Sequence, residues 1–206
     1  MPGQIVLVST VDAAGEANVA PKSWVSMAAF GGPIVAFGCT EAHRSLANVA
    51  ETGEFVVNVV SEPLVERVWE LVCSHGAERL SRSGLTLVPA QKLRPPLVEE
   101  CPAHLECELD DVKRYGAGAF VFGRIVAASI DGECLGKDTA EQYFRLRPVF
   151  YLEEGTYASI DTAKRVGGVW PADQPVFMIE VGAHGEGAAV SDLRPAPPPT
   201  PLPRRT

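Results

Sequence analysis

The stretch between residues 8 and 60 constrains the fold most, because patterns typical of strands and one helix follow each other in it without a long gap. A strand-turn-strand comes first and ends in the run NVAPKSW at residues 18–24. A hydrophobic strand at 34–39 then leads into a short polar helix at 42–52, and another apolar strand follows at 55–60. Apolar, β-branched runs bounded by Gly, Pro and Asp predict strands and turns. The order predicts a β-rich domain.

The same criteria place the remaining elements. Apolar spacing and Gly53 at the end favour the helix at 42–52, with Thr40 able to cap its start. Pro63 suits the first turn of a second helix, and residues 78–83 favour a further helical turn. The segment 135–147 fits either a helix or an irregular loop. The two strands of the strand-turn-strand are expected at residues 4–11 and 17–20. Further strands are expected at 23–30, 104–112, 118–130, 149–152 and 157–160.

Charge and composition exclude several function classes. The 206-residue chain has a formal net charge of −8, which argues against nonspecific binding to nucleic acid or to an anionic membrane surface. It contains no apolar run of 18 residues, and its first residues lack a secretory leader pattern. Its five cysteines include no CxxC pair, so we expect free thiols. We therefore expect a cytoplasmic protein of one domain with decoration.

The strand, turn and helix patterns of residues 8–60, in this order, resemble the flavin reductase-like family. The resemblance is strongest over residues 5–60 and continues through the L-E-C-E-L strand at 105–109 and the R-P-V element at 147–149. It implies an FMN-binding split β-barrel over residues 1–160, mostly antiparallel, with Greek-key character and two or three peripheral helices. Residues 161–193 would be an extension holding one strand at 176–181. The proline-rich residues 194–206 would be a tail without regular structure.

The resemblance also implies which residues hold the flavin. A strand can present backbone groups to the isoalloxazine edge, and Ala20-Pro21 combines a small side chain with a fixed bend. On spacing alone, Asn18 and Pro21 could merely shape a turn. Lys22 stands where the family usually has an aromatic residue. The residues implied along the flavin are Asn18, Ala20, Pro21, Ser23, Trp24, Val25, Ser26, Cys39 and Thr40.

A phosphate site is expected at the start of the 42–52 helix. The free N–H groups and partial positive charge of a helix N-terminus favour anions. His43, Arg44, Ser45 and Asn48 are the side chains implied there, and Arg44 replaces an acid that is common in the family. The alternative is an ordinary amphipathic helix with Ser45 and Asn48 on its polar side.

A cluster of metal-ligand residue types, Cys101, His104 and Cys107, has the wrong spacing for a metal site. Alternate residues of a strand face opposite ways, so His104 and Cys107 would diverge. No second ligand pair accompanies them, and we expect no metal.

The activity implied by the resemblance is reduction of flavin by NADH or NADPH, with hydride delivered to flavin N5. The family further implies a homodimer with FMN near the interface, and a partner monooxygenase or other electron acceptor. The flavin carries the chemistry, so no acid-base catalyst is assigned. Two alternatives stay open: a non-enzymatic FMN electron carrier resembling flavoredoxin, and a flavin-free dimeric scaffold. The sequence leaves open the choice of nicotinamide, and whether flavin is a bound cofactor or a released substrate.

Overall fold

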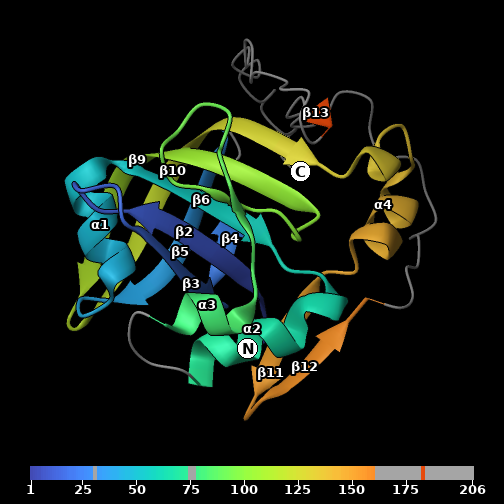
Figure 1. Ribbon diagram of the computed structural model, residues 1–206, viewed down its shortest axis with the longest axis horizontal. Helices are drawn as coiled ribbons and strands as arrows, with labels where there is room; N and C mark the ends of the chain where they lie inside the picture. The colour runs from blue at the N-terminus through green and yellow to red at the C-terminus, as the bar shows by residue number, and fades with distance from the viewer. Residues whose placement is uncertain (30–31, 74–77, 161–181, 184–206) are drawn as a thin grey trace, which may run out of the picture.

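The fold is a curled antiparallel sheet with helices at its end and on its outer surface (Figure 1). The computed structural model describes residues 1–29, 32–73, 78–160 and 182–183. None of the helices in these residues has the length and apolar character needed to cross a lipid bilayer. The prediction of a mostly antiparallel β fold is confirmed.

The main sheet has the order β3-β2-β6-β9-β10-β5-β4. Its two edge strands, β3 and β4, are consecutive in the chain, so the bend at Ser23 and Trp24 carries the backbone from one edge to the other. The Gly38 amide of β5 donates to the Trp24 carbonyl (2.8 Å) and ties this bend to the sheet. The strands are β2 (Val6–Val11), β3 (Ala17–Lys22), β4 (Val25–Met27), β5 (Ile34–Thr40), β6 (Glu54–Val59), β9 (Ala103–Tyr115) and β10 (Gly118–Ile130).

Alternating apolar side chains from these strands fill the inside of the curl. Phe37 and Phe55 are fully buried and meet edge to face, with ring centroids 5.1 Å apart. A Cβ on Gly123 of β10 would lie 2.2 Å from the Phe55 ring, so only glycine leaves room for this pair. Two register shifts between β9 and β10 add to the curvature of the sheet. Gly123 and the two register shifts all lie in the β9–β10 hairpin, which bends around the core.

Helix α1 (Arg44–Thr52) closes one end of the barrel, because Leu46 and Val49 belong to the inner core. Gly53 ends the helix in the left-handed conformation (φ 73°), as expected. The start differs from the prediction: the helix begins at Arg44 with His43 at the N-cap, and Thr40 does not cap it. Thr40 is still the last residue of β5, and two turn residues separate it from His43.

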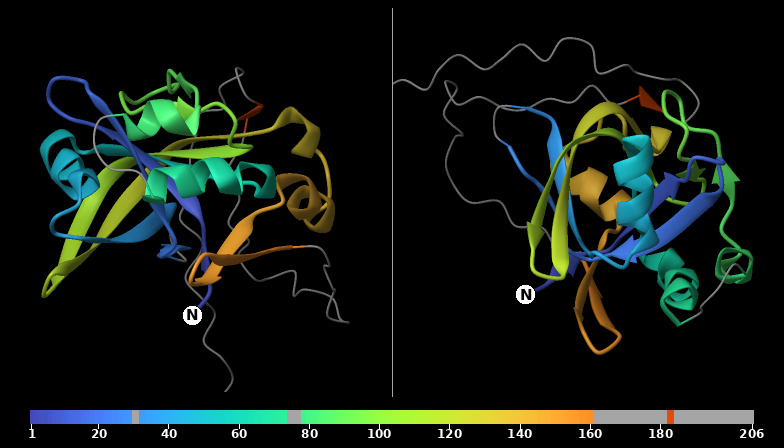
Figure 2. Two further views of the ribbon diagram at one scale, coloured as in Figure 1. Left: turned by 60° about the horizontal axis from the view of Figure 1, so that its bottom comes forward. Right: turned by 90° about the vertical axis from the view of Figure 1, so that its left-hand side faces the viewer.

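Helix α2 (Val65–Cys73) covers the outer face of β2 and β3, as Figure 2 shows from two sides. Its buried residues Val68 and Leu71 join Leu7 and Val19 in a second apolar cluster. The elements around it are a 3-10 turn at Glu62–Leu64, α3 (Arg79–Ser83), and the short strands β7 (Leu87–Val88) and β8 (Leu97–Val98). Two apolar layers thus stabilise the β2–β3 ribbon, one on each face.

The remaining elements refine the sequence expectations. The segment 135–147, left open above, contains α4 (Thr139–Leu146), so the described residues hold four α-helices rather than two or three. Of the strand expected at 23–30, Val25–Met27 pairs with β5 as β4, Ser23 and Trp24 form the bend before it, and residue 30 lies outside the described residues. The other elements are β1 (Gly3–Gln4), a 3-10 turn at Gly132–Cys134, β11 (Val149–Glu153), β12 (Thr156–Ser159) and β13 (Gly182–Ala183).

The outer boundaries of the expected domains are not tested by this structure. The strand expected at 176–181 and the tail at 194–206 lie outside the described residues. Within the described part, β13 pairs in parallel with the last two residues of β10.

Candidate functional site

A pocket of about 550 Å³ lies between β3, the start of α1 and helix α2. Its polar side is formed by Asn18, Lys22, Ser23, His43, Arg44, Ser45 and Arg79. Its apolar side comes from β3, α2, β11, the residue between β1 and β2, and the residue after β6. These residues are Ile5, Ala20, Pro21, Val60, Val65, Val68, Trp69, Leu71, Val72 and Tyr151. A pocket of this size that combines an apolar wall with a few convergent polar groups is typical of small-molecule sites.

Three basic side chains meet at the polar side of the pocket. Lys22 of β3 is only 8% exposed, and its Nζ lies 3.2 Å from Nδ1 of His43. Arg79, at the start of α3, donates to the backbone carbonyl of Val19. Within the described residues, neither Lys22 nor Arg79 forms an ion pair with a carboxylate. The pocket therefore presents excess positive charge, which suits an anionic ligand.

Burial and mutual repulsion set the pKa values of this group. Burial lowers the pKa of Lys22, and the charge of Arg79 lowers it further. The pKa of His43 is likewise lowered by burial and then by the charges of Lys22 and Arg79. Both groups are thus less ready to carry a proton than in water. An arriving anion would reverse both effects, because it favours the charged forms.

The tautomer of His43 follows from its neighbours. The backbone N–H of Thr40 points at His43 Nδ1 (3.3 Å), and Lys22 Nζ is the second donor to the same atom. An atom that accepts two hydrogen bonds carries the lone pair, so the neutral ring bears its proton on Nε2. The ring is left with an N–H donor for a ligand.

A buried network fastens α1 to the β2–β3 ribbon. The Asn18 amide donates to Ser45 Oγ and to Thr10 Oγ1 (both 3.3 Å), and the Asn48 amide donates to Thr10 Oγ1 (3.0 Å). Thr10, Ser45 and Asn48 are almost completely buried. The network holds the first turn of α1 against β3, so that His43 and Ser45 face the same pocket as Lys22.

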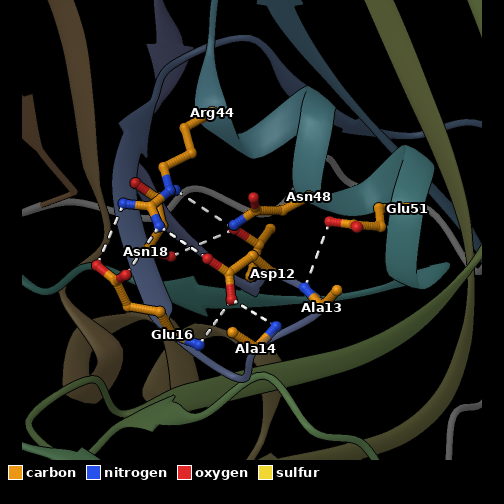
Figure 3. Close-up of polar contacts among 9 residues, drawn as sticks. Asp12, Ala13, Ala14, Glu16, Asn18, Arg44, Asn48 and Glu51 are labelled. Carbon is orange, nitrogen blue, oxygen red and sulfur yellow. Dashed lines mark hydrogen bonds and ion pairs between the residues drawn. The ribbon is translucent and has the colours of Figure 1, made fainter.

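Arg44 is held by the β2–β3 turn, as Figure 3 shows. Its guanidinium lies 2.9 Å from Asp12 Oδ2 and 3.3 Å from Glu16 Oε2. Asp12 also accepts from the backbone N–H groups of Ala14 and Glu16, which orders the turn. Hydrogen bonds to Glu16 and then to Asp12 raise the pKa of Arg44. The sequence predicted Arg44 as a phosphate ligand; the structure places it at the pocket rim with its charge already paired.

We therefore expect Arg44→Met to change affinity for a phosphate ligand by less than about threefold. An exposed ion pair contributes about 0–1 kcal/mol, and its charge is already compensated by two carboxylates. Isothermal titration with FMN measures the effect, with Arg82→Met as a control for an exposed, paired arginine. A tenfold loss confined to Arg44→Met would show that the side chain leaves Asp12 to bind the ligand.

The structure brings only some of the sequence-predicted residues to this pocket. Asn18, Ala20, Pro21, Ser23, His43, Arg44 and Ser45 line it, whereas Trp24, Val25, Ser26, Cys39, Thr40 and Asn48 do not. Trp24 is 67% exposed and stacks on Phe120, with rings 12° from parallel. Ser26 is exposed, and Val25 and Cys39 pack against the barrel core. Burial raises the pKa of the Cys39 thiol.

Sequence reasoning missed two kinds of pocket residue. Arg79 arrives from 57 positions beyond Lys22 in the chain, and the apolar wall comes from Trp69 and Val72 of α2. Trp69 and Val72 are 43% and 45% exposed, and Val72 follows the buried Val68 by one turn on the same side of α2. Trp69 is a detectable signal, because it extends the apolar surface of the helix beyond the side that packs on the sheet.

The Cys101–Cys107 cluster has a structural role. His104 is buried, with Nδ1 3.1 Å from Ser129 Oγ and Nε2 2.9 Å from the Val98 carbonyl. Both ring nitrogens are therefore engaged by protein atoms. The described residues contain no group of three or more His, Cys, Asp or Glu side chains placed to bind a metal ion.

Comparison with known proteins shows which family this chain resembles in sequence and fold. Residues 1–158 match the family model described as "Flavin reductase like domain". An uncharacterized protein of Pyrococcus abyssi is 31% identical over 112 residues, 54% of this chain and 65% of its own length. The chain thus spans just under two thirds of that relative.

Two further proteins carry functional names. The Rhodococcus jostii protein named "Flavin-dependent monooxygenase, reductase subunit HsaB" is 25% identical over 174 residues, 84% of this chain and 80% of its own. The structure of 2-nitrobenzoate 2-nitroreductase NbaA from Pseudomonas fluorescens superposes with a TM-score of 0.69 at 27% identity, covering 85% of this chain and 88% of its own. Split-barrel flavin reductase structures also share this fold.

Proposed function

Because the chain belongs to the flavin reductase-like family, we propose that it binds FMN in the pocket between β3, α1 and α2 and reduces it with NADH or NADPH. The observation that carries the proposal is a set of basic groups, Lys22, His43 and Arg79, that line one pocket with an apolar wall and have no carboxylate partner among the described residues. FMN has the matching halves, a phosphate and a large flat ring system.

The residues that are present fit FMN. Lys22, Arg79, the His43 Nε2–H and the Ser45 hydroxyl would hold the phosphate, at the start of α1 where an anion is favoured. Trp69, Val72 and Tyr151 offer apolar surface for the ring. β3 is an edge strand, and the Val19 carbonyl, which faces Arg79, shows that its outer backbone groups are turned towards this side.

Bound flavin would supply the redox chemistry by accepting hydride from nicotinamide at N5. The chain would bind and orient the two ligands and limit water in the pocket. No side chain is assigned a proton-transfer step. The name of the Rhodococcus jostii relative supports a role as the reductase partner of a monooxygenase, which we extend to this chain as part of the proposal.

A homodimer completes the proposal, as the resemblance implies. Trp24 in the bend that closes the barrel and Met27 in the strand after it are both exposed apolar side chains. Burial of that pair against a second subunit would remove apolar surface from water. Light scattering gives the mass in solution, and a monomer at all concentrations would exclude this part.

The expected result is that the purified protein binds FMN and that NADH or NADPH bleaches the bound flavin near 450 nm (roughly) in the absence of oxygen. The rate of bleaching must exceed that of free FMN at the same concentration. Binding without accelerated bleaching would instead support the electron-carrier alternative. No binding of FMN would leave the flavin-free scaffold.

A further inference from the structure

Lys22 is an unusual residue for the inside of this structure. It is the last residue of β3, in a strand whose other buried residues are apolar, and its side chain is almost fully covered. Its amine contacts a histidine, which cannot neutralise it, and it has no carboxylate contact within the described residues. A buried cation without a counter-charge lowers stability, so its presence suggests that a ligand supplies that charge.

The titratable groups that act on Lys22 make the same point. Cys39 on β5 is a thiol whose pKa is raised, so it is neutral near pH 7. His43 at the start of α1 and Arg79 on α3 are basic, and both line the pocket. Arg44 is compensated by Asp12 and Glu16. No group in this set offers Lys22 a negative charge.

We propose that Lys22 and His43 act together as a phosphate reader: the pair takes up a proton when a terminal phosphate dianion binds, and so selects that dianion. This inference rests on the proposed function and adds a specificity residue to it. A terminal phosphate monoester carries nearly two negative charges at neutral pH, because its second pKa is about 6. A phosphodiester carries one charge per phosphate, and an unphosphorylated ligand carries none.

The direction of proton movement follows from the electrostatics. In the free pocket, burial and neighbouring positive charges lower the pKa of both groups. A dianion within contact distance raises both pKa values, because it stabilises the protonated forms. Between the free and the bound pKa of either group, binding must therefore draw protons from solution. Because the ordinary pKa of histidine lies below that of lysine, His43 would contribute at lower pH than Lys22.

The first test compares three flavins by isothermal titration with the full-length protein: FMN, riboflavin and FAD. We expect the wild type to prefer FMN, and Lys22→Met to lose at least about tenfold in FMN affinity. Riboflavin affinity should stay within about twofold, so that the ratio between the two ligands falls. Lys92→Met is the matched control: it removes the same charge from an exposed lysine whose ammonium donates to the Val126 carbonyl. An unchanged FMN-to-riboflavin ratio in Lys22→Met would overturn the proposal.

The second test counts protons. Titrations at several values between pH 7.5 and 9, in two buffers of different ionisation enthalpy, give the protons taken up per flavin. FMN phosphate is already a dianion in this range, so uptake reports protein groups. We expect up to about one proton with FMN, almost none with riboflavin, and a clear decrease in Lys22→Met. Equal uptake with FMN and riboflavin throughout this range would also overturn the proposal.

These results separate the two proposals. A wild-type protein that binds no flavin would refute the proposed function. A protein that binds FMN and riboflavin equally would refute only the phosphate reader. Lys22→Met removes a desolvated charge, so it should fold with an unchanged or higher melting temperature. If Lys22→Met does not fold, His43→Gln tests the phosphate reader instead. Proton uptake with FMN at pH 7.5 should then fall by at least about half, and unchanged uptake would refute the phosphate reader.

Discussion

Arg79→Ala is expected to weaken FMN binding by about 10- to 100-fold. The guanidinium lies at the polar side of the pocket and forms no ion pair within the described residues. A charge-assisted hydrogen bond to phosphate contributes about 1.5–3 kcal/mol, and about 1.4 kcal/mol corresponds to a factor of ten. Burial lowers the pKa of Arg79, which indicates that its desolvation is already incurred before a ligand arrives. A preorganised cation of this kind binds an anion at little further cost.

The control lies on the same short helix. Arg82 is exposed and paired with Glu78, so Arg82→Ala should leave FMN affinity unchanged. Riboflavin gives a second control, because it lacks the phosphate. Arg79 also contacts the Val19 carbonyl, and a loss of strand order would weaken riboflavin binding as well. Equal losses for FMN and riboflavin would therefore contradict a phosphate contact.

Glu106→Ala is expected to lower the free energy of unfolding by about 3–5 kcal/mol. The Glu106 carboxylate is buried on β9 and accepts from the backbone N–H groups of Gln91, Lys92 and Leu93, at 2.8–3.1 Å. Its removal leaves three donors without an acceptor, and removing one side of a buried charged interaction costs several kcal/mol. Urea unfolding followed by circular dichroism measures the change.

Two variants bracket the Glu106 effect. Glu106→Gln keeps one acceptor oxygen and should cost less than alanine. Glu108, two residues further along β9, is exposed, so Glu108→Ala should shift stability by less than about 0.5 kcal/mol. A small effect of Glu106→Ala would mean that water replaces the carboxylate and that the 91–93 loop is less dependent on it.

Much of the barrel was predictable because its strands are apolar runs separated by turn residues. The strand at 34–39 ends within one residue of β5, and the helix of residues 42–52 ends at Gly53 as expected. The strand at 23–30 was overestimated, because Trp24 belongs to the bend that closes the sheet. Its alternating pattern came from an exposed stacked ring, which a sequence cannot distinguish from a buried one.

The sequence assigned residues of β3 and of the start of α1 to one ligand site, and the structure brings Asn18, His43 and Ser45 to one pocket. The charge balance depends on contacts between distant residues: Asp12 and Glu16 compensate Arg44, and Arg79 reaches the pocket from another element. Arg44, which was expected to bind phosphate, is therefore paired. Lys22, noted only as a departure from the family, lines the pocket and has no carboxylate partner among the described residues.

The bend that links β3 to β4 also bears on how this chain avoids aggregation. An open antiparallel sheet has two edges at which another chain can add a strand. Here one edge, β4, offers only three residues, and the other, β3, carries a proline and a buried lysine and is packed against α2. Charged residues and proline at an edge discourage intermolecular strand addition. The residues that shape the ligand pocket thus also make the sheet a poor template for fibrils.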